Sequence, residues 1–248
     1  MSNVRFDFTD ENFVVTGASS GMGRQVVKDL AVAGACVLAI ARREEVLLEL
    51  QKEYPGNISI AAADVCDHIA METAVYNFVQ QHGKLHGGVH AAGVLGITPL
   101  KQFNPAEAHR IMDISFWAGI NFLQLCTKVA YSEKGASFVL FSSADAIAAE
   151  KGKFAYSASK MALNSAVKAI AKEIARRGQR VNTVLPGWVD TAMTQNASEM
   201  TDMEPILKRQ LLGIGKPEQV SGLILFLLSD RANWITGTNA IVDGGYLA

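Results

Sequence analysis

The sequence predicts an α/β fold: one doubly wound domain with a parallel seven-stranded sheet and helices on both faces. Short apolar runs alternate with longer amphipathic segments along all 248 residues, which is typical of strands connected by helices. The runs lack the apolar and polar alternation of half-exposed strands, so they suit parallel strands that are buried on both faces. A glycine-rich turn joins the first run to the first helical segment, which is where such folds bind ligands.

Each element follows from its local pattern. The short apolar runs are the expected strands: 13–16, 36–41, 58–62, 88–91, 137–141, 181–185 and 240–242. The segments between them have apolar residues at helical spacing and are the expected helices: 22–33, 43–54, 68–82, 104–131, 155–177 and 217–229. The chain has no linker, internal repeat or low-complexity tract, so we expect residues 1–248 to form a single domain.

The alternation of strands and helices lapses between residues 192 and 216. This segment contains Met193, Met200, Met203 and the pair Leu211 and Leu212. An insertion after the carboxyl end of a strand is a common place for a mobile lid over a substrate. A plain pair of surface helices is the alternative interpretation of the same segment.

Composition and net charge limit the kinds of molecule that the protein is expected to bind. Hydrophobic residues make up 49% of the chain and charged residues 19%, so a large core can be buried. The net charge of −1 offers no electrostatic footprint for nucleic acid or for an anionic membrane. The first twelve residues contain acids and no apolar run, so they do not resemble a signal peptide. No apolar run approaches the roughly 18 residues that span a bilayer, so we expect a cytoplasmic protein.

The cysteines carry no sign of metal or redox chemistry. Cys36, Cys66 and Cys126 are far apart and lack the paired spacing of a metal site or a redox motif. We therefore expect all three to be small buried side chains, and we expect no metal site.

The glycine-rich turn predicts a dinucleotide site of Rossmann type. Gly17 permits a tight turn, Gly21 lets backbone N–H groups approach a pyrophosphate, and Gly23 lets the helix pack closely on the strand. A glycine pattern alone is weak evidence, but its position after the first strand is the context that the motif requires. The residues of this loop expected to bind the cofactor are Gly17, Ser19, Ser20, Gly21, Met22 and Gly23.

The end of the second strand indicates NADP(H) as the cofactor. NAD enzymes usually place an acid there for the ribose 2′-hydroxyl, but this chain has Ala41 at that position, followed by Arg42 and Arg43. A guanidinium suits a 2′-phosphate better than a neutral hydroxyl. The alternative is that both arginines merely solvate the start of a helix.

A hydroxyl, a phenol and an ammonium form the candidate catalytic group. Tyr156 and Lys160 are four residues apart, so they are neighbours on one helix face. A nearby cation favours the phenolate, so we expect Lys160 to lower the pKa of Tyr156 and make it an acid and base. Ser143 follows a predicted strand at the sheet edge where ligands bind.

These motifs resemble those of the short-chain dehydrogenase/reductase family. The Thr-Gly-x-x-x-Gly-x-Gly turn and the order and spacing of Ser143, Tyr156 and Lys160 match its pattern, and the resemblance runs from Phe13 to the end. It places Asp64 and Val65 at the adenine, and the Val189 backbone and Thr191 hydroxyl at the nicotinamide carboxamide. The further cofactor-binding residues it implies are Asp64, Val65, Ala91, Ala92, Gly93, Tyr156, Lys160, Pro186, Gly187, Val189 and Thr191.

Two positions depart from the family pattern. The family usually has Asn-Asn-Ala-Gly after the fourth strand, whereas this chain begins that phrase with His90. The family's fourth catalytic residue is an asparagine, and Ser115 stands in its place; Asn121 lies on another helix face. We expect His90 to be a packed, hydrogen-bonded core residue. Ser115 is kept as a catalytic candidate: either it joins a proton relay or it only fills space.

The expected function is hydride transfer between NADP(H) and a carbonyl or secondary alcohol, as in a ketone or 3-oxoacyl reductase. A non-catalytic NADP(H)-binding regulatory subunit is the alternative, although such a protein would be expected to lack Tyr156 or Lys160. Epimerase and dehydratase relatives are typically longer. A mostly apolar pocket, and so a hydrophobic substrate, is expected from Leu95, Ala144, Ile147, Trp188, Met193 and Met200.

The family also implies assembly into a homodimer or homotetramer. The helix over 155–177 carries a stripe of alanines spaced three or four residues apart: Ala158, Ala162, Ala166 and Ala169. The helix over 104–131 carries apolar side chains beyond those that one sheet face needs: Phe116, Trp117, Phe122 and Leu125. In the family these two helices pair across a two-fold axis, and the alternative is that the alanines are buried within the monomer.

Overall fold

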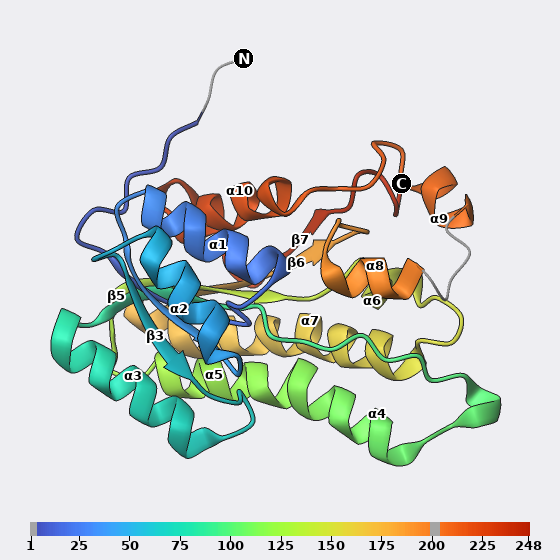
Figure 1. Ribbon diagram of the computed structural model, residues 1–248, viewed down its shortest axis with the longest axis horizontal. Coiled ribbons are helices and arrows are strands. Elements are labelled where there is room, and N and C mark those ends of the chain that lie inside the picture. The colour runs from blue at the N-terminus through green and yellow to red at the C-terminus, as the bar shows by residue number, and fades with distance from the viewer. Residues whose placement is uncertain (1–3, 199–203) are drawn as a thin grey trace.

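A single parallel sheet runs through the centre of the molecule (Figure 1). The computed structural model describes residues 4–198 and 204–248. The strands lie in the order β3-β2-β1-β4-β5-β6-β7, and every neighbouring pair is parallel. Their bounds are β1 (Asn12–Thr16), β2 (Cys36–Ala41), β3 (Ile58–Ala62), β4 (Leu85–His90), β5 (Ser132–Phe141), β6 (Arg180–Pro186) and β7 (Asn239–Val242). The predicted fold class is confirmed.

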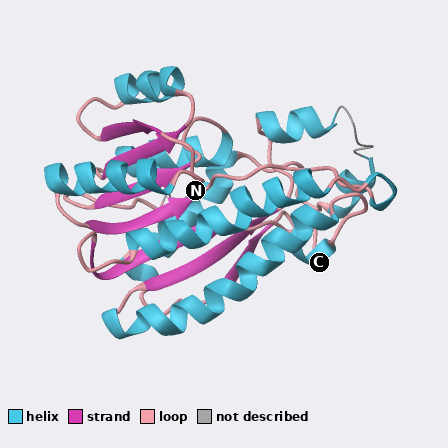
Figure 2. Ribbon diagram, turned by 90° about the horizontal axis from the view of Figure 1, so that it is seen from below, coloured by secondary structure: helices cyan, strands magenta, loops and turns pink. Residues whose placement is uncertain are grey.

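Helices cover both faces of this sheet (Figures 1 and 2). The buried residues of α1 (Gly21–Val32), α2 (Glu44–Glu53) and α10 (Pro217–Leu228) belong to one apolar core. The buried residues of α3 (His68–His82), α5 (Ala118–Cys126) and α7 (Phe154–Ile174) belong to the other. The fold is thus three layers deep, with one core on each side of the sheet.

The burial of β1 explains why the strand pattern shows no alternation. All five residues of this strand are buried. Phe13 and Val15 face the core of α1 and α10, whereas Val14 faces the core of α5 and α7. Because successive side chains point to opposite faces, a strand covered on both sides needs apolar residues throughout.

The strand order reverses between β1 and β4, which places a crevice at their carboxyl ends. Thr16 and His90 are paired across these strands at their last residues. The glycine-rich turn follows Thr16, and the loop beginning at Ala91 follows His90. Both loops therefore leave the sheet side by side, where a doubly wound fold binds its ligand.

The predicted helix over 104–131 is broken into three parts. α4 (Pro105–Met112) leads into a π-helical turn, Asp113–Trp117, and α5 then ends at Cys126. Residues at the predicted end are not helical, because β5 begins at Ser132 and pairs with Leu85 of β4. The helix is therefore shorter than predicted, and both β4 and β5 start earlier than the sequence indicated.

The segment 192–216 contains two short helices at the carboxyl end of the sheet (Figure 1). These are α8 (Ala192–Ser198) and α9 (Glu204–Arg209), and a bridge between Val189 and Gly215 ties the end of the segment to the loop after β6. Met200 and Met203 lie outside the described residues. The helical content fits a surface helix pair, and a lid made from the same helices stays a prediction.

The cysteines do not share one environment. Cys126 is fully buried, whereas Cys36 is half-buried with its Sγ 3.4 Å from Nδ1 of His82. Cys66 is exposed, so the prediction of three buried cysteines is wrong for this residue. The physical reason is its place in the loop between β3 and α3, two residues after Asp64. Among the described residues, no cluster of three or more His, Cys, Asp or Glu side chains could hold a metal ion.

The surface of the paired helices fits the assembly prediction only in part. Phe122 and Leu125 are buried in the core, so the expectation that they supply surplus apolar surface is wrong. Trp117 is 52% exposed, and Ala158 and Ala169 are exposed as well. The alanines are thus not buried within the monomer as the alternative required.

Candidate active site

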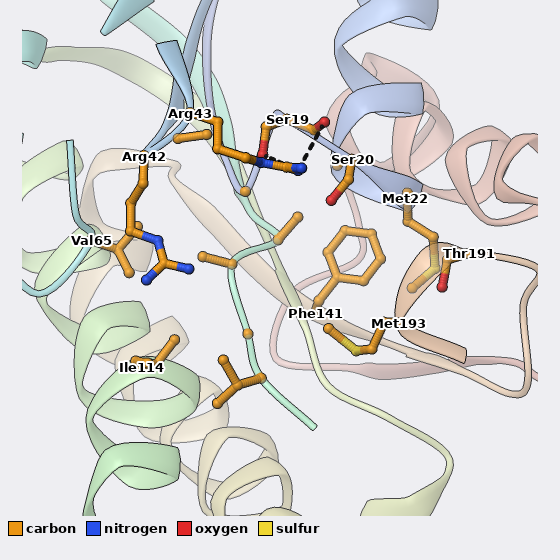
Figure 3. Close-up of a pocket in the computed structure, with 18 of the residues that line it drawn as sticks. Ser19, Ser20, Met22, Arg42, Arg43, Val65, Ile114, Phe141, Thr191 and Met193 are labelled. Atoms are coloured by element: carbon orange, nitrogen blue, oxygen red, sulfur yellow. Dashed lines mark hydrogen bonds between the residues drawn. The ribbon is translucent and has the colours of Figure 1, made fainter. Parts of the chain in front are cut away.

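A cavity of about 280 Å³ opens at the carboxyl ends of β1, β2 and β4 (Figure 3). It collects the predicted cofactor residues from the loops after five strands, β1, β2, β3, β4 and β6: Gly17, Ser19, Ser20, Gly21, Met22, Gly23, Arg42, Arg43, Asp64, Val65, Ala91, Ala92, Gly93 and Thr191. The other predicted cofactor residues do not line this cavity. Pro186, Gly187, Val189 and Tyr156 line a second one beside it, and Lys160 lines neither.

The glycine loop has the shape that a pyrophosphate requires. Gly17 has φ of +69°, and a Cβ added there would lie 2.7 Å from the backbone of Ala91 and Ala92. Gly23 packs against the carbonyl of Gly17 so closely that no side chain fits. α1 begins at Gly21, and its N-cap residue Ser20 makes no side-chain capping bond within the described chain. The N–H groups of the first turn can therefore bind an anion, which fits a dinucleotide.

The two arginines occupy different positions at this cavity. Nη2 of Arg43 donates to Oγ of Ser19 at 3.0 Å, so Arg43 holds the glycine loop (Figure 3). Arg42 is exposed and lies on the side of Val65. Its guanidinium donates no hydrogen bond within the described part of the chain. Ala41 is buried and supplies no carboxylate, so positive charge dominates the place where an NAD enzyme has an acid.

Ser143, Tyr156 and Lys160 converge at the end of β5 and the first turns of α7. The hydroxyl of Ser143 accepts from the backbone N–H of Asp145 at 3.1 Å and lines the same cavity as Tyr156, close enough to favour its phenolate form. Lys160 Nζ lies 5.8 Å from the ring centroid of Tyr156 and donates to the carbonyl of Phe141 at 2.7 Å. The structure thus brings the three predicted catalytic residues together.

The electrostatics of this group differ from the prediction. Desolvation raises the pKa of Tyr156 to about 12; the Ser143 hydrogen bond opposes this shift, and the Asp145 carboxylate adds to it. The expected lowering of the Tyr156 pKa by Lys160 is therefore wrong here, because its ammonium is directed at the Phe141 carbonyl. Burial lowers the pKa of Lys160 to about 8. A phenol with so high a pKa is protonated at neutral pH, which is the state of a proton donor.

Ser115 reaches the site through the π-helical turn. It is fully buried, and its Oγ has no hydrogen-bond partner in the described structure. A Cβ added to Gly93 would lie 3.4 Å from Lys160 Nζ and 3.8 Å from Ser115 Oγ, so both groups approach the same glycine. Asn121 instead lies 3.3 Å from His68 Nε2 on another face of the helix, as predicted. Ser115 therefore lies within the π turn and near Lys160.

His90 is a buried residue of the core behind the site, as predicted. It is 1% exposed, and its Nδ1 lies 2.9 Å from Oγ1 of Thr16. Burial lowers the pKa of His90 to about 3, and the charge of Lys160 acts in the same direction. The imidazole is therefore neutral, and it ties β4 to β1 beneath the crevice.

The second cavity, of about 90 Å³, adjoins the catalytic residues Ser143 and Tyr156. Met22, Thr191 and Met193 line both cavities, so the two lie side by side. Of the predicted pocket residues, those that line it are Leu95, Ala144, Trp188 and Met193. Ile147 is half exposed and lies outside the lining, and Met200 lies outside the described residues.

Comparison with known proteins assigns the family. A family model described as enoyl-(acyl carrier protein) reductase matches residues 17–247. A 3-oxoacyl-(acyl-carrier-protein) reductase from Thermotoga maritima is 33% identical over 236 residues, which cover 94% of this chain and 96% of that protein. The chain belongs to the short-chain dehydrogenase/reductase family.

Other members of this family are similar over nearly the whole chain. An L-xylulose reductase from Caenorhabditis elegans is 34% identical over 245 residues, 97% of each protein. The crystal structure of a short-chain dehydrogenase/reductase from Brucella melitensis matches with a TM-score of 0.92 at 26% identity, covering 98% of this chain and 99% of that one. The protein is thus an oxidoreductase of a family that uses nicotinamide cofactors on CH–OH or C=O groups.

Sequence reasoning missed the polar part of this dehydrogenase/reductase pocket. Asp145, Lys153 and Tyr246 line the second cavity, so the expectation of little charge there is wrong. Asp145 comes two residues after Ser143, and Lys153 comes one helical turn before Tyr156. Proximity to the catalytic motifs was the available signal for both. Tyr246 gave no such signal, because its place depends on how the last residues fold back.

Within the described residues, no helix combines the length and apolar composition needed to cross a membrane.

Proposed function

We propose that the protein is an NADP(H)-dependent oxidoreductase acting on a carbonyl or secondary alcohol, as a ketone or 3-oxoacyl reductase does. The observation that carries this proposal is the convergence of Ser143, Tyr156 and Lys160 beside the glycine-loop cavity. The names of two relatives, a 3-oxoacyl reductase and an L-xylulose reductase, describe carbonyl reduction and support the same class.

The roles of the catalytic side chains follow from their positions. Tyr156 donates a proton to the carbonyl oxygen, and Ser143 hydrogen-bonds that oxygen as charge develops on it. Lys160, whose Nζ lies 5.8 Å from the ring centroid of Tyr156, holds the ribose of the cofactor. The bound nicotinamide supplies the hydride. In the opposite direction Tyr156 accepts the proton of the alcohol.

The preference for NADP(H) rests on the end of β2. Arg42 faces the cavity with no hydrogen bond to another described residue, and Ala41 gives no acid for a ribose 2′-hydroxyl. A 2′-phosphate would give the Arg42 guanidinium a charged acceptor. Arg43, which already bonds Ser19, would support the loop that carries the pyrophosphate.

We also propose a role for Ser115 in proton resupply. Its buried hydroxyl and the ammonium of Lys160 approach the same residue, Gly93. A hydroxyl is shorter than an amide and offers one donor, so Ser115 would hold a relay water less well than asparagine. The competing view is that Ser115 only fills space.

The same proposal extends to assembly and location. A homodimer or homotetramer would cover the exposed Trp117 and the exposed alanines of α7. The helices α8 and α9 would act as a lid over the substrate cavity, which Met193 and Thr194 of α8 line. The net charge of −1 and the acidic first residues agree with a cytoplasmic protein.

The test is NADPH oxidation across a panel of ketones, aldehydes and 3-oxoacyl thioesters, with the Tyr156→Phe variant as control. We expect turnover by the natural protein and a loss of ~10²–10⁴-fold in the variant, with NADPH affinity within a few-fold, because the ring remains and the proton donor is gone. A variant that kept most of its rate would remove Tyr156 from its role. Tight NADPH binding with no turnover across the panel would favour the regulatory-subunit alternative.

A further inference from the structure

Lys153 places an ammonium group in the wall of the substrate cavity. The residue immediately precedes α7, three positions before Tyr156, and its side chain is only 12% exposed. It lines the same cavity as Ser143 and Tyr156. Its Nζ lies 5.0 Å from the ring centroid of Trp188, another residue of this wall. The aromatic ring holds the cation beside the place where the carbonyl reacts.

The donors of this ammonium are unused. Lys153 Nζ donates no hydrogen bond within the described chain, and the carboxylate nearest to it, Oδ2 of Asp145, is 3.8 Å away. That distance permits electrostatic attraction but is too long for a hydrogen bond. An ammonium has three donors, and the Nζ atom of Lys153 is not itself sealed from the cavity. A ligand oxygen in the cavity could therefore accept a hydrogen bond from it.

The carboxylate of Asp145 determines whether a neutral or an anionic ligand oxygen is preferred beside Lys153. Its Oδ1 accepts from the backbone N–H of Glu150 at 3.0 Å, whereas its Oδ2 is buried without a hydrogen-bond partner in the described structure. The carboxylate cancels the charge of Lys153, so the pair presents donors without net positive charge. An anionic group beside Lys153 would also be repelled by the Asp145 carboxylate, whose Oδ2 is 3.8 Å from the ammonium. A neutral oxygen gains the hydrogen bond without that repulsion.

We propose that Lys153 donates a hydrogen bond to a second, uncharged oxygen of the substrate, a carbonyl or hydroxyl a few bonds from the carbonyl that Tyr156 protonates. The protein would then select oxygenated carbonyl compounds, such as hydroxyketones and 3-oxo esters, over plain ketones and over 3-oxo acids. This inference rests on the proposed function and makes Lys153 a specificity-determining residue rather than part of the proton transfer.

The test compares substrates of equal chain length with and without a second oxygen group: acetoin against butanone, and ethyl acetoacetate against heptan-2-one. Lys153→Met keeps the length of the side chain and removes its donors, whereas Lys151→Met, an exposed neighbour, is the matched control. The ratio of kcat/KM within each pair should fall about tenfold or more in Lys153→Met and stay unchanged in Lys151→Met. Comparing ratios between proteins cancels the intrinsic reactivity of each substrate.

Two further variants complete the test. Lys153→Arg retains a cation with donors and should keep most of the preference, even if Lys153→Met proves unstable. Asp145→Asn should raise the ratio of kcat/KM for acetoacetate to kcat/KM for ethyl acetoacetate. The variant lacks the carboxylate that repels the anionic substrate. Equal ratios in the natural protein and Lys153→Met, or a natural preference for acetoacetate over the ester, would overturn the inference. If either of these results were obtained while the plain ketones were still reduced, only the inference about Lys153 would fail, and the proposed function would remain supported.

Discussion

At the scale of single residues, Arg42 and Arg43 show that adjacent side chains of one type do different work. Arg43 is bonded to Ser19 in the glycine loop, so under the proposed function it would support the binding of either nicotinamide cofactor. Arg42 lines the cavity without a hydrogen bond in the described structure, so it is the residue free to contact a 2′-phosphate. The sequence analysis assigned both arginines to a 2′-phosphate, whereas in the structure only Arg43 is hydrogen-bonded to the glycine loop.

The first prediction separates these two roles. Ala41→Asp combined with Arg42→Leu should shift preference from NADPH toward NADH, because a charge-assisted hydrogen bond of about 1.5–3 kcal/mol is worth roughly tenfold to a hundredfold in affinity. Arg43→Leu should weaken both cofactors to a similar degree. Dissociation constants from fluorescence titration check both, and equal affinity of the natural protein for NADPH and NADH would contradict the assignment.

His90 leads to a second prediction, on stability and pH. The pKa of His90 is lowered to about 3 in the folded protein, while a histidine in the unfolded chain titrates near 6.5. Between these values only the unfolded chain binds the proton, so the free energy of unfolding falls as the pH falls. The slope is about 1.4 kcal/mol per pH unit, or roughly 2 kcal/mol from pH 6.5 to pH 5.

Urea denaturation at several pH values checks this contribution at a fixed protein concentration. His90→Asn should flatten the dependence between pH 6.5 and 5, whereas His109→Asn, at an exposed position, should leave it unchanged. The comparison concerns slopes, because losing the contact with Thr16 will lower the stability of the His90 variant at every pH. Identical slopes in all three proteins would mean that other groups carry the acid sensitivity.

At the scale of the element, the π-helical turn is the feature that brings Ser115 to the site. An α-helix places residues 113–117 at regular angles, and the extra residue of a π turn rotates the side chains that come after it. Sequence periodicity predicted one continuous helix here, because a single wide turn leaves the apolar spacing on either side nearly intact. The turn at which the helix prediction failed is therefore also the turn that carries Ser115.

The third prediction tests the proton relay at this turn. If Ser115 joins the relay less effectively than an asparagine, Ser115→Asn should keep or raise the rate and shrink the solvent isotope effect on turnover. Ser115→Ala should lower the rate, since it removes the only polar group of this side chain. Matching rates and isotope effects in Ser115→Ala and the natural protein would leave Ser115 with a packing role.

At the scale of the whole molecule, the layered architecture could be predicted because it rests on repeated patterns. The seven apolar runs matched strands in place, and the helices between them matched within a few residues except at 104–131. Residues fixed by motif, such as Ser143 and Tyr156, were also found. A residue brought to the cavity by tertiary folding was not: Tyr246 lies ninety residues after Tyr156 in the sequence, and both line the same cavity.

The fourth prediction concerns assembly. Trp117 is 52% exposed and packs against Phe116 at 4.7 Å between ring centroids, leaving a large apolar surface open. We expect light scattering at micromolar concentration to give the mass of a dimer or tetramer, and Trp117→Glu to lower that mass by placing a charge in the interface. Tyr76→Glu, at an exposed aromatic residue of α3, is the control. A monomeric mass for the natural protein would refute the assembly.

The wall of the substrate cavity is built on its own small apolar cluster. Ala144, Ile206 and Tyr246 pack together there, apart from the two cores that flank the sheet. Substitutions in this cluster can change which molecules fit without touching either of the two large cores. Directed evolution of substrate range should therefore begin at this cavity wall, with folding followed in parallel because all three side chains are buried.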